Sequence, residues 1–369
     1  MRVIHVAPTP FGARGLFGGG ERYPLELARA LAQQVDCELI TFGRRAQTER
    51  EPGGLRVRTL RATGWMGGHP ANPLAPALVA ALLKIRPGSH VVHTHHMRSL
   101  PSQMTALVGR ARHQHLAVTD HGLQGSDWGG LLPRLFDVFL PVSAYSSREL
   151  DAPPGRTRVI YGGADPVRYA PDPNQPRRGA LFVGRLTPHK GVDRLLHALP
   201  AGAHLSVAGS AGHDARLPER DYPKLLRRLG VGHDVDFLGT VADDNLPRLF
   251  RSASVLVMPS VERTCYGRSV RVSELLGLVA LEAMASATPV VASHVGGLPE
   301  VVQDGVTGFL VPPGDVQALH ARLDQLLGDP SLAQKMGHNA RERVLEQFTW
   351  ARVAERCLAA YAELSGTDA

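Results

Sequence analysis

The stretch "GALFVGRLTPHKGVDRLLHALPAGAHLSVAGS", residues 179–210, carries the pattern that decides the fold. Apolar residues dominate 179–186 and 204–210, as expected of two buried strands. Between them, a short loop over 187–191 leads into 192–199, where apolar residues recur at helical spacing. A strand, a loop, a helix and a second strand in this order are typical of a parallel α/β sheet.

The beginning of the chain shows the same order. We expect a strand over 2–8, a glycine-rich loop over 11–21, a helix over 22–33 and a strand over 37–43. Two such beginnings in a chain of 369 residues predict two doubly wound, Rossmann-like α/β domains, each with its own parallel sheet. Further strands are expected at 90–96, 116–122, 138–146, 157–165, 235–241, 255–260, 288–297 and 308–315.

The proline-rich segment "YAPDPNQPRR", residues 169–178, predicts the linker between the two domains. We therefore expect an N-terminal domain over 1–168 and a C-terminal domain over 169–345. Ligands of such sheets bind beyond the carboxyl ends of the strands, so the cleft between the domains is the expected site.

Composition limits the classes of function. The net charge is +7, but the basic residues are dispersed, which argues against nucleic acid and fits an enzyme of phosphate-bearing substrates. Arginine far outnumbers lysine, which indicates a GC-rich, bacterial genome. No apolar run approaches a membrane span and the start is too short for a signal peptide, so we expect a cytoplasmic protein. Cys37, Cys265 and Cys357 lack CxxC spacing and predict inert thiols.

Two acids occupy an unusual place in "SELLGLVALEAMA", residues 273–285. Glu274 and Glu282 flank an apolar run that Gly277 interrupts. We expect a helix to begin at Gly277, which leaves Glu274 in the preceding loop and places Glu282 one turn into the helix. Backbone amides there could bind an anion, and the glycine would let a phosphate approach. The alternative is an ordinary helix with one exposed glutamate and an acid that favours its dipole. In the first interpretation, the amides that could bind an anion are those of Gly277, Leu278 and Val279.

Two further loops could bind phosphate. Arg185 and Lys190 follow a predicted strand, and a forked guanidinium with a compact ammonium suits a diphosphate, unless the loop is simply solvated. The amides of "GLFGGGE", residues 15–21, could form an anion nest, although a plain flexible loop fits equally well. Neither GxGxxG nor GxxxxGK[ST] occurs, so the dinucleotide and P-loop interpretations are weak.

Histidines and a short acidic motif offer metal-binding alternatives. Alternation places His93 and His95 on one strand face, as a metal pair or, as we favour, as packed or hydrogen-bonded histidines. His121 ends a predicted strand before a glycine and is better placed to contact a substrate. The "DVD" at 234–236 mimics a metal-binding DxD, but it enters a predicted buried strand, so we discount it. No metal is expected.

Taken together, these segments resemble the family 4 glycosyltransferases, retaining enzymes of the GT-B fold, in which two Rossmann-like domains face each other across a cleft. The resemblance spans nearly the whole chain. The most specific segment is "ELLGLVALEAMASATPVVASHVGGLPEVVQDGVTGFLVPPGD", residues 274–315. Weaker segments in the family's order are "GGGERYPLELARALA", "VTDHG", "PVSAYS", "VIYGGADPVRY", "FVGRLTPHKGVDRLL", "VDFLGTV" and "LVMPS".

The resemblance implies a role for each candidate residue. It assigns Glu282 to the ribose hydroxyls of a nucleotide-sugar donor and Glu274 to the donor sugar. Arg185 and Lys190 would grip the diphosphate and stabilise its charge as it leaves. His121 would lie beside the hydroxymethyl group of the donor sugar. The residues whose backbone would approach the donor or the acceptor are Gly19, Gly20, Val241, Gly277, Leu278 and Val279.

The implied activity is a retaining, metal-independent transfer of a hexose-type sugar from a nucleotide diphosphate to an acceptor hydroxyl, with no other cofactor. The donor would bind mainly to the C-terminal domain and the acceptor to the N-terminal domain, to which a final helix in 346–369 would cross back. The leaving phosphate would assist the incoming hydroxyl on the same face, in contrast to the paired acids of glycosidases. The acceptor could be a lipid head group at a membrane surface, a glycan, or a small aminocyclitol or other natural product.

The sequence departs from the family pattern in one place. The first glutamate commonly follows "PS", here residues 259–260, after two or three residues. An insert at 261–273 intervenes, and Glu262 mimics the usual position. We assign Glu274 because its spacing to Glu282 and the following glycine fit. The insert could line the acceptor or the donor sugar through Tyr266, Arg268 and Arg271.

Two rival functions remain open, an epimerase and a binding protein, and the scarcity of lysine argues against a third, a phosphorylase. A nucleotide-sugar epimerase of the same fold would react without an acceptor. A glycan phosphorylase would need pyridoxal phosphate on one of only four lysines. A non-catalytic protein that binds sugar nucleotides or nucleic acid would explain the charge, and its affinity for nucleic acid would fall steeply with salt.

Overall fold

The computed structural model describes residues 1–12, 18–86, 90–122, 125–150, 152–211 and 219–366. The chain divides into two compact units. Unit 1 comprises 1–162 together with 350–369, and unit 2 comprises 163–349. The last helix, α12 (Trp350–Ser365), therefore belongs to the unit that contains the N-terminus.

Unit 1 is built on a seven-stranded sheet with the strand order β3-β4-β2-β1-β7-β8-β9. Its strands pair in parallel, except that the edge strand β3 runs antiparallel to β4. The strands are β1 (Arg2–Val6), β2 (Asp36–Gly43), β3 (Gln47–Arg50), β4 (Arg56–Arg61), β7 (His90–His95), β8 (His115–Thr119) and β9 (Val138–Phe139). The small pair β5 (Gly64–Trp65) and β6 (Pro73–Leu74) lies apart from this sheet. The helices besides α12 are α1 (Gly19–Ala32), α2 (Pro76–Leu83), α3 (Leu100–Ala111) and α4 (Ala144–Glu149).

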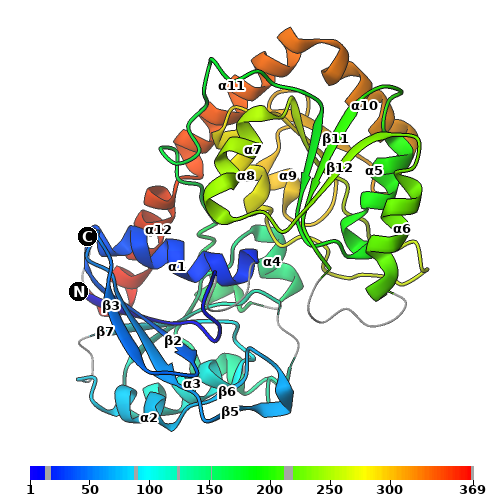
Figure 1. Ribbon diagram of the computed structural model, residues 1–369. Coiled ribbons are helices and arrows are strands. Elements are labelled where there is room, and N and C mark those ends of the chain that lie inside the picture. Colours follow the sequence, from blue (N-terminus) through cyan, green and yellow to red (C-terminus); the bar gives the residue numbers. More distant parts are fainter. Residues whose placement is uncertain (13–17, 87–89, 123–124, 151, 212–218, 367–369) are drawn as a thin grey trace. The chain divides into compact units, whose positions relative to one another are not determined.

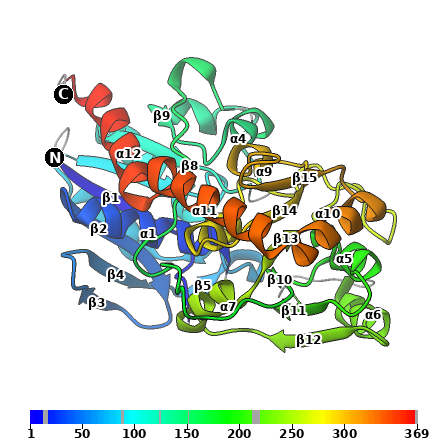
Figure 2. The same cartoon turned by 90° about the horizontal axis from the view of Figure 1, so that it is seen from above.

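Helices cover both faces of this sheet. α1 and α12 lie side by side on one face (Figures 1 and 2), and α2 and α3 lie on the other (Figure 1). The strand alternation accounts for the two faces. Ile4 and Val6 of β1 belong to the same apolar core as Leu78 and Leu82 of α2. His5, between them, points to the opposite face, because successive side chains of a strand alternate. This second face is apolar at its helices but carries buried histidines at its strands.

Unit 2 contains a six-stranded parallel sheet with the order β12-β11-β10-β13-β14-β15. The strands are β10 (Ala180–Val183), β11 (His204–Ala208), β12 (Asp234–Gly239), β13 (Val255–Met258), β14 (Val290–Ser293) and β15 (Gly308–Val311). The helices are α5 (Val192–Ala198), α6 (Tyr222–Leu229), α7 (Leu246–Ser252), α8 (Leu278–Ala285), α9 (Leu298–Val301), α10 (Val316–Gly328) and α11 (Pro330–Gln347).

The centre of the second sheet is buried on both faces. Every residue of β13 and β14 is buried, as expected of parallel strands covered by helices on both sides. On one face, α5, α6 and α10 share an apolar core with β10, β11 and β13. On the other face, α8 packs against α7 and α11. The short apolar runs of the sequence are therefore core strands, and the carboxyl edge of the sheet is left to loops.

The expected fold class is confirmed, since both units are parallel α/β sheets covered by helices on two faces. The strand expected at 157–165 is wrong: only isolated bridges occur there, although the amides of Arg158 and Ile160 donate to the carbonyls of Phe139 and Pro141. The strand expected at 138–146 ends at Phe139, because Pro141 has no amide to continue the ladder.

Two helix beginnings also differ from expectation. The helix expected over 22–33 begins at Gly19, so Gly19 and Gly20 belong to the first turn of α1 and not to the preceding loop. The short helix α4, with a capping box between Ser143 and Ser146, replaces the end of an expected strand. Residues 13–17 of the glycine-rich loop lie outside the described residues. Among those that are described, no helix is both long and apolar enough to cross a membrane.

The core of unit 2 predicts a clear difference between two leucine truncations. Leu195 of α5 is fully buried in the apolar core, whereas Leu238 of β12 is 43% exposed. Leu195→Ala should lower the free energy of unfolding of unit 2 by about 2–5 kcal/mol, because the cavity adds to the lost transfer energy. Leu238→Ala should change it by less than about 1 kcal/mol. Denaturant unfolding checks both, and equal losses would contradict the assigned core.

Candidate active site

The residues expected to bind a donor in unit 2 follow the carboxyl ends of neighbouring parallel strands. Arg185 and Lys190 come after β10, Val241 comes after β12, and Ser260 comes after β13. Because parallel strands end at the same edge of a sheet, these residues share one edge. Arg185 is exposed there and Val241 is half-buried.

The loop that carries Lys190 is tied to the end of β13. It forms the short 3-10 helix η4 (Pro188–Lys190), which Gly191 ends with a left-handed φ of 69°. A Cβ on Gly191 would lie 1.9 Å from the carbonyl oxygen of Pro259, so only glycine permits this approach. The amide of Val261 also donates to the carbonyl of His189 over 2.8 Å. The position of Lys190 is therefore fixed by backbone contacts.

Glu274 meets Lys190 at this edge. The Lys190 ammonium donates to Glu274 Oε1, and the Ser260 hydroxyl donates to the same oxygen over 2.8 Å. The side chains of Lys190 and Glu274 are only 18% and 9% exposed. A carboxylate that is this buried needs compensation, which the cation and the hydroxyl supply. The structure thus brings together two residues that lie 84 positions apart.

Two consecutive glycines after β14 hold the loop that contains Glu274. A Cβ on Gly296, where φ is 61°, would lie 1.9 Å from the carbonyl oxygen of Glu274. A Cβ on Gly297 would lie 2.4 Å from the carbonyl oxygen of Leu275. The amide of Gly297 donates to the Glu274 carbonyl over 3.1 Å. These close approaches explain the "GG" of the sequence, since any larger residue would displace the Glu274 loop.

The helix after Glu274 starts within one residue of its expected position. α8 begins at Leu278, with Gly277 as its N-cap at a φ of 103°. A Cβ on Gly277 would lie 2.7 Å from the side chain of Leu298, so the glycine serves the packing of α9 as well as an open approach to the backbone. The amides of the first turn have no acceptor within the helix and favour an anion. Glu282 lies one turn further on and is buried.

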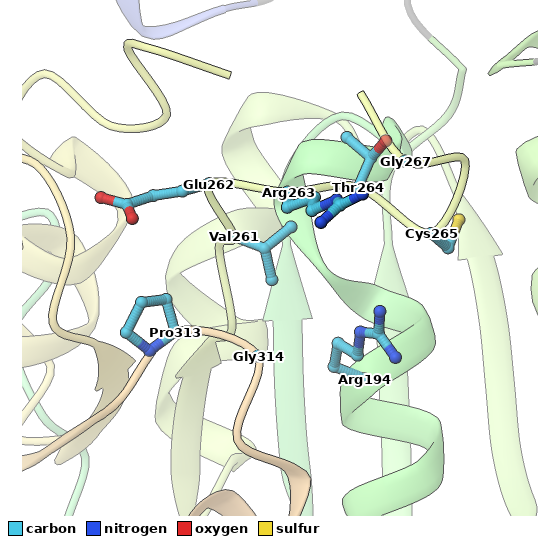
Figure 3. A pocket seen from close by; sticks show the side chains of 9 residues that line it. All are labelled: Arg194, Val261, Glu262, Arg263, Thr264, Cys265, Gly267, Pro313 and Gly314. Atoms are coloured by element: carbon cyan, nitrogen blue, oxygen red, sulfur yellow. The ribbon is translucent and has the colours of Figure 1, made fainter. Parts of the chain in front are cut away.

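The insert at 261–273 folds onto the side of α5 and α6. Its Arg268 pairs with Glu219 over 2.7 Å, and the ring of Tyr266 lies 6.5 Å from that of Tyr222 in α6. Residues of the insert line one side of a pocket of about 430 Å³ (Figure 3). In this view the carboxylate of Glu262 points away from Arg194, whose guanidinium points toward the insert. The residues that line the cavity are Arg194, Val261, Glu262, Arg263, Thr264, Cys265, Gly267, Pro313 and Gly314.

In unit 1, Gly20 and His121 lie close together. A Cβ on Gly20 would lie 3.3 Å from His96 Cε1 and 3.7 Å from the Cβ of His121. Gly19 and Gly20 occupy the first turn of α1, where amides are again without helical acceptors. The Tyr23 ring contacts that of His121 edge-on, with the centroids 5.1 Å apart. The structure therefore brings Gly20, in the first turn of α1, next to His121, the candidate histidine of this unit.

His93 and His95 share a strand face, as the alternation predicted, and hydrogen bonds hold both rings. His93 contacts the Tyr361 hydroxyl over 2.7 Å and the Thr119 hydroxyl over 2.8 Å. His95 contacts His5 over 3.0 Å and His121 over 3.4 Å. His5, His93 and His95 each have a ring nitrogen within 4.8 Å of the others. A metal at this point would require His93 to give up a hydrogen bond.

The acidic motif "DVD" lies away from the candidate site. Asp234 and Asp236 begin β12 at its amino end, opposite the edge that carries Lys190. β12 is an edge strand with exposed residues at alternate positions, so the expectation of a buried strand is wrong. Asp234 pairs with Arg178 over 2.8 Å and with His204 over 3.2 Å. These contacts account for the motif without a ligand.

Models of known protein families match both units. A model described as "Glycosyl transferases group 1" matches residues 168–343, and one described as "Glycosyltransferase Family 4" matches residues 17–168. A D-inositol 3-phosphate glycosyltransferase of Streptomyces bingchenggensis is 31% identical over 98% of this chain and 88% of that protein. The chain belongs to the family 4 glycosyltransferases.

Other relatives and solved structures agree with this family. An alpha-maltose-1-phosphate synthase of Mycobacterium tuberculosis is 37% identical over 56% of this chain and 57% of that protein. The structure of a sucrose-phosphate synthase from Thermosynechococcus elongatus has a TM-score of 0.73 at 24% identity and covers 99% of both chains. Anabaena HepE in complex with UDP has a TM-score of 0.74 at 20% identity, covering 98% of this chain and all of HepE. These two structures establish the GT-B fold of this glycosyltransferase.

The sequence left some supporting residues of this glycosyltransferase unidentified. Ser260 was visible only as the end of "MPS", and its bond to Glu274 depends on how the insert folds. Gly296 and Gly297 lay within a strand prediction, although two adjacent glycines indicate a close backbone approach. Thr119 and Tyr361 gave no signal at all, because their contact with His93 depends on the strand order and on α12.

The buried histidines should make unit 1 sensitive to acid. Burial lowers the pKa of His5 to about 3 and that of His96 to about 4, and it lowers the pKa values of His93, His95 and His121 well below 6.5. Below pH 6.5 the unfolded chain therefore takes up protons that the folded unit does not. The resulting stability is fully present above pH 6.5 and is lost as pH falls toward the lowered values. Each histidine contributes up to about 1.4 kcal/mol per pH unit.

A variant can test this dependence. His5→Gln removes one titrating group, so its unfolding free energy should decrease less steeply between pH 6.5 and 5 than that of the unmodified chain. Denaturant unfolding at several pH values measures the two slopes. Equal slopes would contradict the prediction, because they would show that the pKa of His5 is the same in the folded and the unfolded chain.

Proposed function

We propose that this glycosyltransferase moves a hexose-type sugar from a nucleotide diphosphate donor to an acceptor hydroxyl, with retention and without a metal ion. The observation that carries the proposal is the Lys190–Glu274 pair beside the N-terminus of α8. Together they place a cation, free amides and a buried carboxylate at the carboxyl edge of one sheet. A diphosphate and a sugar require these groups in the same place.

The diphosphate is proposed to bind to Lys190, Arg185 and the first-turn amides of α8. The Lys190 ammonium has three protons, and one is directed to Glu274, which leaves the others for phosphate oxygens. Arg185 is exposed and can present its forked donors to a ligand. The charge that develops on the leaving diphosphate would thus meet fixed cations and amide dipoles.

The sugar and nucleoside are proposed to bind to groups on either side of the phosphates. Both hydrogen bonds of Glu274 fall on Oε1, so Oε2 is the oxygen that would accept from a sugar hydroxyl. Glu282 is assigned to the ribose, and the backbone of Val241 to the base. From unit 1, His121 is assigned to the sugar hydroxymethyl group. The solved structures of HepE with UDP and with UDP-glucose support a uridine nucleotide as the first donor to test.

In the proposed reaction the bond between sugar C1 and the diphosphate oxygen breaks, and the acceptor oxygen forms a bond to C1 on the same face. The proton of the acceptor hydroxyl passes to an oxygen of the leaving diphosphate. No carboxylate nucleophile is invoked, because Glu274 is occupied by Lys190 and Ser260. The leaving group therefore acts as the base, and the protein stabilises its charge.

For the acceptor, an anionic hydroxyl compound is the first choice. The chain carries a net charge of +7. Two relatives are named for acting on or forming phosphorylated compounds, a D-inositol 3-phosphate glycosyltransferase and an alpha-maltose-1-phosphate synthase. A sugar or polyol phosphate fits both observations. Lipid head groups and aminocyclitols are the next acceptors to test, and Gly19 and Gly20 of α1 are proposed to lie on the acceptor side.

A donor screen followed by product analysis tests the proposed activity. UDP-, GDP- and ADP-glucose are compared for thermal stabilisation, since a ligand at 100 times its Kd adds about 2.7 kcal/mol. The best donor is then incubated with pooled acceptors in EDTA, and products are identified by mass spectrometry and anomeric NMR. An α-linked product from an α-linked donor is expected. An isomerised sugar without acceptor would indicate an epimerase, and binding without turnover would indicate a binding protein.

The two candidate glutamates can be separated by matched variants. Glu274→Gln should reduce kcat/KM for the donor by about 100-fold or more, because it weakens the contacts to Lys190 and to the proposed sugar. Glu262→Gln should change it by less than about threefold, since Glu262 is exposed on the insert. Steady-state kinetics with the donor varied provides both values. A larger loss of kcat/KM in Glu262→Gln than in Glu274→Gln would instead assign the contact with the donor sugar to Glu262.

A further inference from the structure

A row of three hydrogen-bonded histidines runs through unit 1 and ends at His121. His5 Nδ1 lies 3.0 Å from His95 Nε2, and His95 Nδ1 lies 3.4 Å from His121 Nε2. The ring planes are nearly parallel, at 21° for His5 and His95 and 16° for His95 and His121, with centroids 5.3 Å and 5.6 Å apart. His5 and His95 are fully buried. Neither residue is expected to touch a substrate, so the presence of two polar rings in a core needs a reason.

For the neighbouring His93, the hydrogen-bond partners determine which ring nitrogen carries the proton. The Thr119 hydroxyl donates its proton to the carbonyl of Leu140 over 2.7 Å. Its oxygen must therefore accept from His93 Nε2, which carries a proton. His93 Nδ1 then accepts from the Tyr361 hydroxyl, whose pKa burial raises well above 10. Both ring nitrogens of His93 are thus occupied. Its ring packs on that of His95, with the centroids 4.6 Å apart, but it makes no hydrogen bond to the three histidines of the row.

The same reasoning gives the row a direction. Burial lowers the pKa of each of the three rings, so each is neutral and has one N–H. His5 Nε2 is buried and has no partner among the described residues. An unpaired buried N–H is rarer in proteins than an unpaired acceptor, so Nε2 is the bare nitrogen of His5. His5 Nδ1–H then donates to His95 Nε2, and His95 Nδ1–H donates to His121 Nε2.

We propose that His5 and His95 are positioning residues that fix His121 as the Nδ1–H tautomer, with its remaining nitrogen presented as a hydrogen-bond donor to a ligand oxygen. A neutral donor at this nitrogen suits the hydroxyl oxygen of a sugar and would not suit an ammonium group. The ligand part of this inference rests on the proposed function, whereas the tautomer is a property of unit 1 alone. The row thus sets which atoms His121 can recognise.

The other groups around His121 leave this assignment intact. Tyr23 meets its ring edge-on, and the Tyr23 hydroxyl donates to the carbonyl of Tyr161. His96 lies 4.9 Å from His121 by ring centroid, and burial lowers its pKa to about 4. The Asp120 carboxylate is directed to Arg98 and to the amide of Gly122. Burial raises the pKa of Asp120 to about 6, and the carboxylate also accepts from the backbone amides of Met97 and His121, which leaves the imidazole of His121 to the row.

Imidazole NMR tests the tautomer without any activity. The chain is labelled with ¹⁵N-histidine, and long-range ¹H–¹⁵N spectra at pH 7.5 in EDTA identify the protonated nitrogen of each ring. His121 should carry its proton on Nδ1. His95→Leu should convert His121 to a mixture of tautomers. His95→Asn should restore the Nδ1–H form, because the asparagine amide occupies the place of the His95 Nδ1–H. A wild-type His121 that is protonated on Nε2 would overturn the proposal.

His93→Leu is the matched control, since His93 lies on the same strand and is equally buried but has no bond to His121. With an active donor and acceptor, His95→Leu should reduce kcat by about tenfold, the loss of about one hydrogen bond. His95→Asn should recover most of it, and His93→Leu should not alter the His121 tautomer. If His95→Leu and His93→Leu changed the His121 tautomer and kcat equally, the histidine row would only contribute packing, and the proposal would be wrong.

Added zinc provides a further test. The tautomer signals should be the same with zinc and with EDTA. Zinc-dependent loss of the N–H signals of His93 and His95, reversed by EDTA, would assign the cluster to a metal instead. If no donor is turned over but His121 remains Nδ1–H only when His95 can donate, the tautomer assignment stands and the proposed function fails.

Discussion

The ion pair between Lys190 and Glu274 is the contact on which the candidate site depends. It joins the loop after β10 to the loop before α8, and both side chains are largely buried. Breaking such a pair leaves an uncompensated charge, so each residue requires the other even without a ligand. The pair also orients the ammonium at the carboxyl edge of the sheet, where the proposed diphosphate would bind. A site prepared in this way does not reorganise its dipoles during the reaction, which is how electrostatic stabilisation lowers a barrier.

Glycine makes this arrangement possible through the backbone. Gly191 allows the Lys190 loop to pass against Pro259, and Gly296 allows the segment after β14 to pass against Glu274. Each approach is too close for any Cβ, so the loops are fixed by main-chain contacts. In unit 1, by contrast, the candidate histidine is supported by side chains in the interior of the sheet. The two units therefore use different means to hold polar groups in place.

The sequence allowed much of unit 2 to be predicted, because its signals are local. Gly277 separates a segment without helical spacing from a strongly helical one. The beginning of α8 and the loop position of Glu274 could therefore be inferred. The partner of Glu274 could not be derived from spacing, since it lies in a different loop. The His5–His95 contact also depends on β1 and β7 being neighbours, which only the strand order reveals. The strand expected at 157–165 does not form. Its residues lie beside β9, the edge strand, which stops at Phe139 shortly before Pro141, so only isolated bridges occur.

Nucleotide binding in the presence of a chelator tests the central claim most directly. Calorimetry with UDP, GDP and ADP in EDTA is compared for the unmodified chain and Arg185→Met, a variant that removes an exposed cation and leaves the buried pair intact. The account predicts that one nucleotide binds equally well with EDTA and with magnesium, and that Arg185→Met weakens it by about tenfold or more. Binding that requires magnesium, or that is indifferent to Arg185, would contradict a diphosphate site made from protein cations and helix amides.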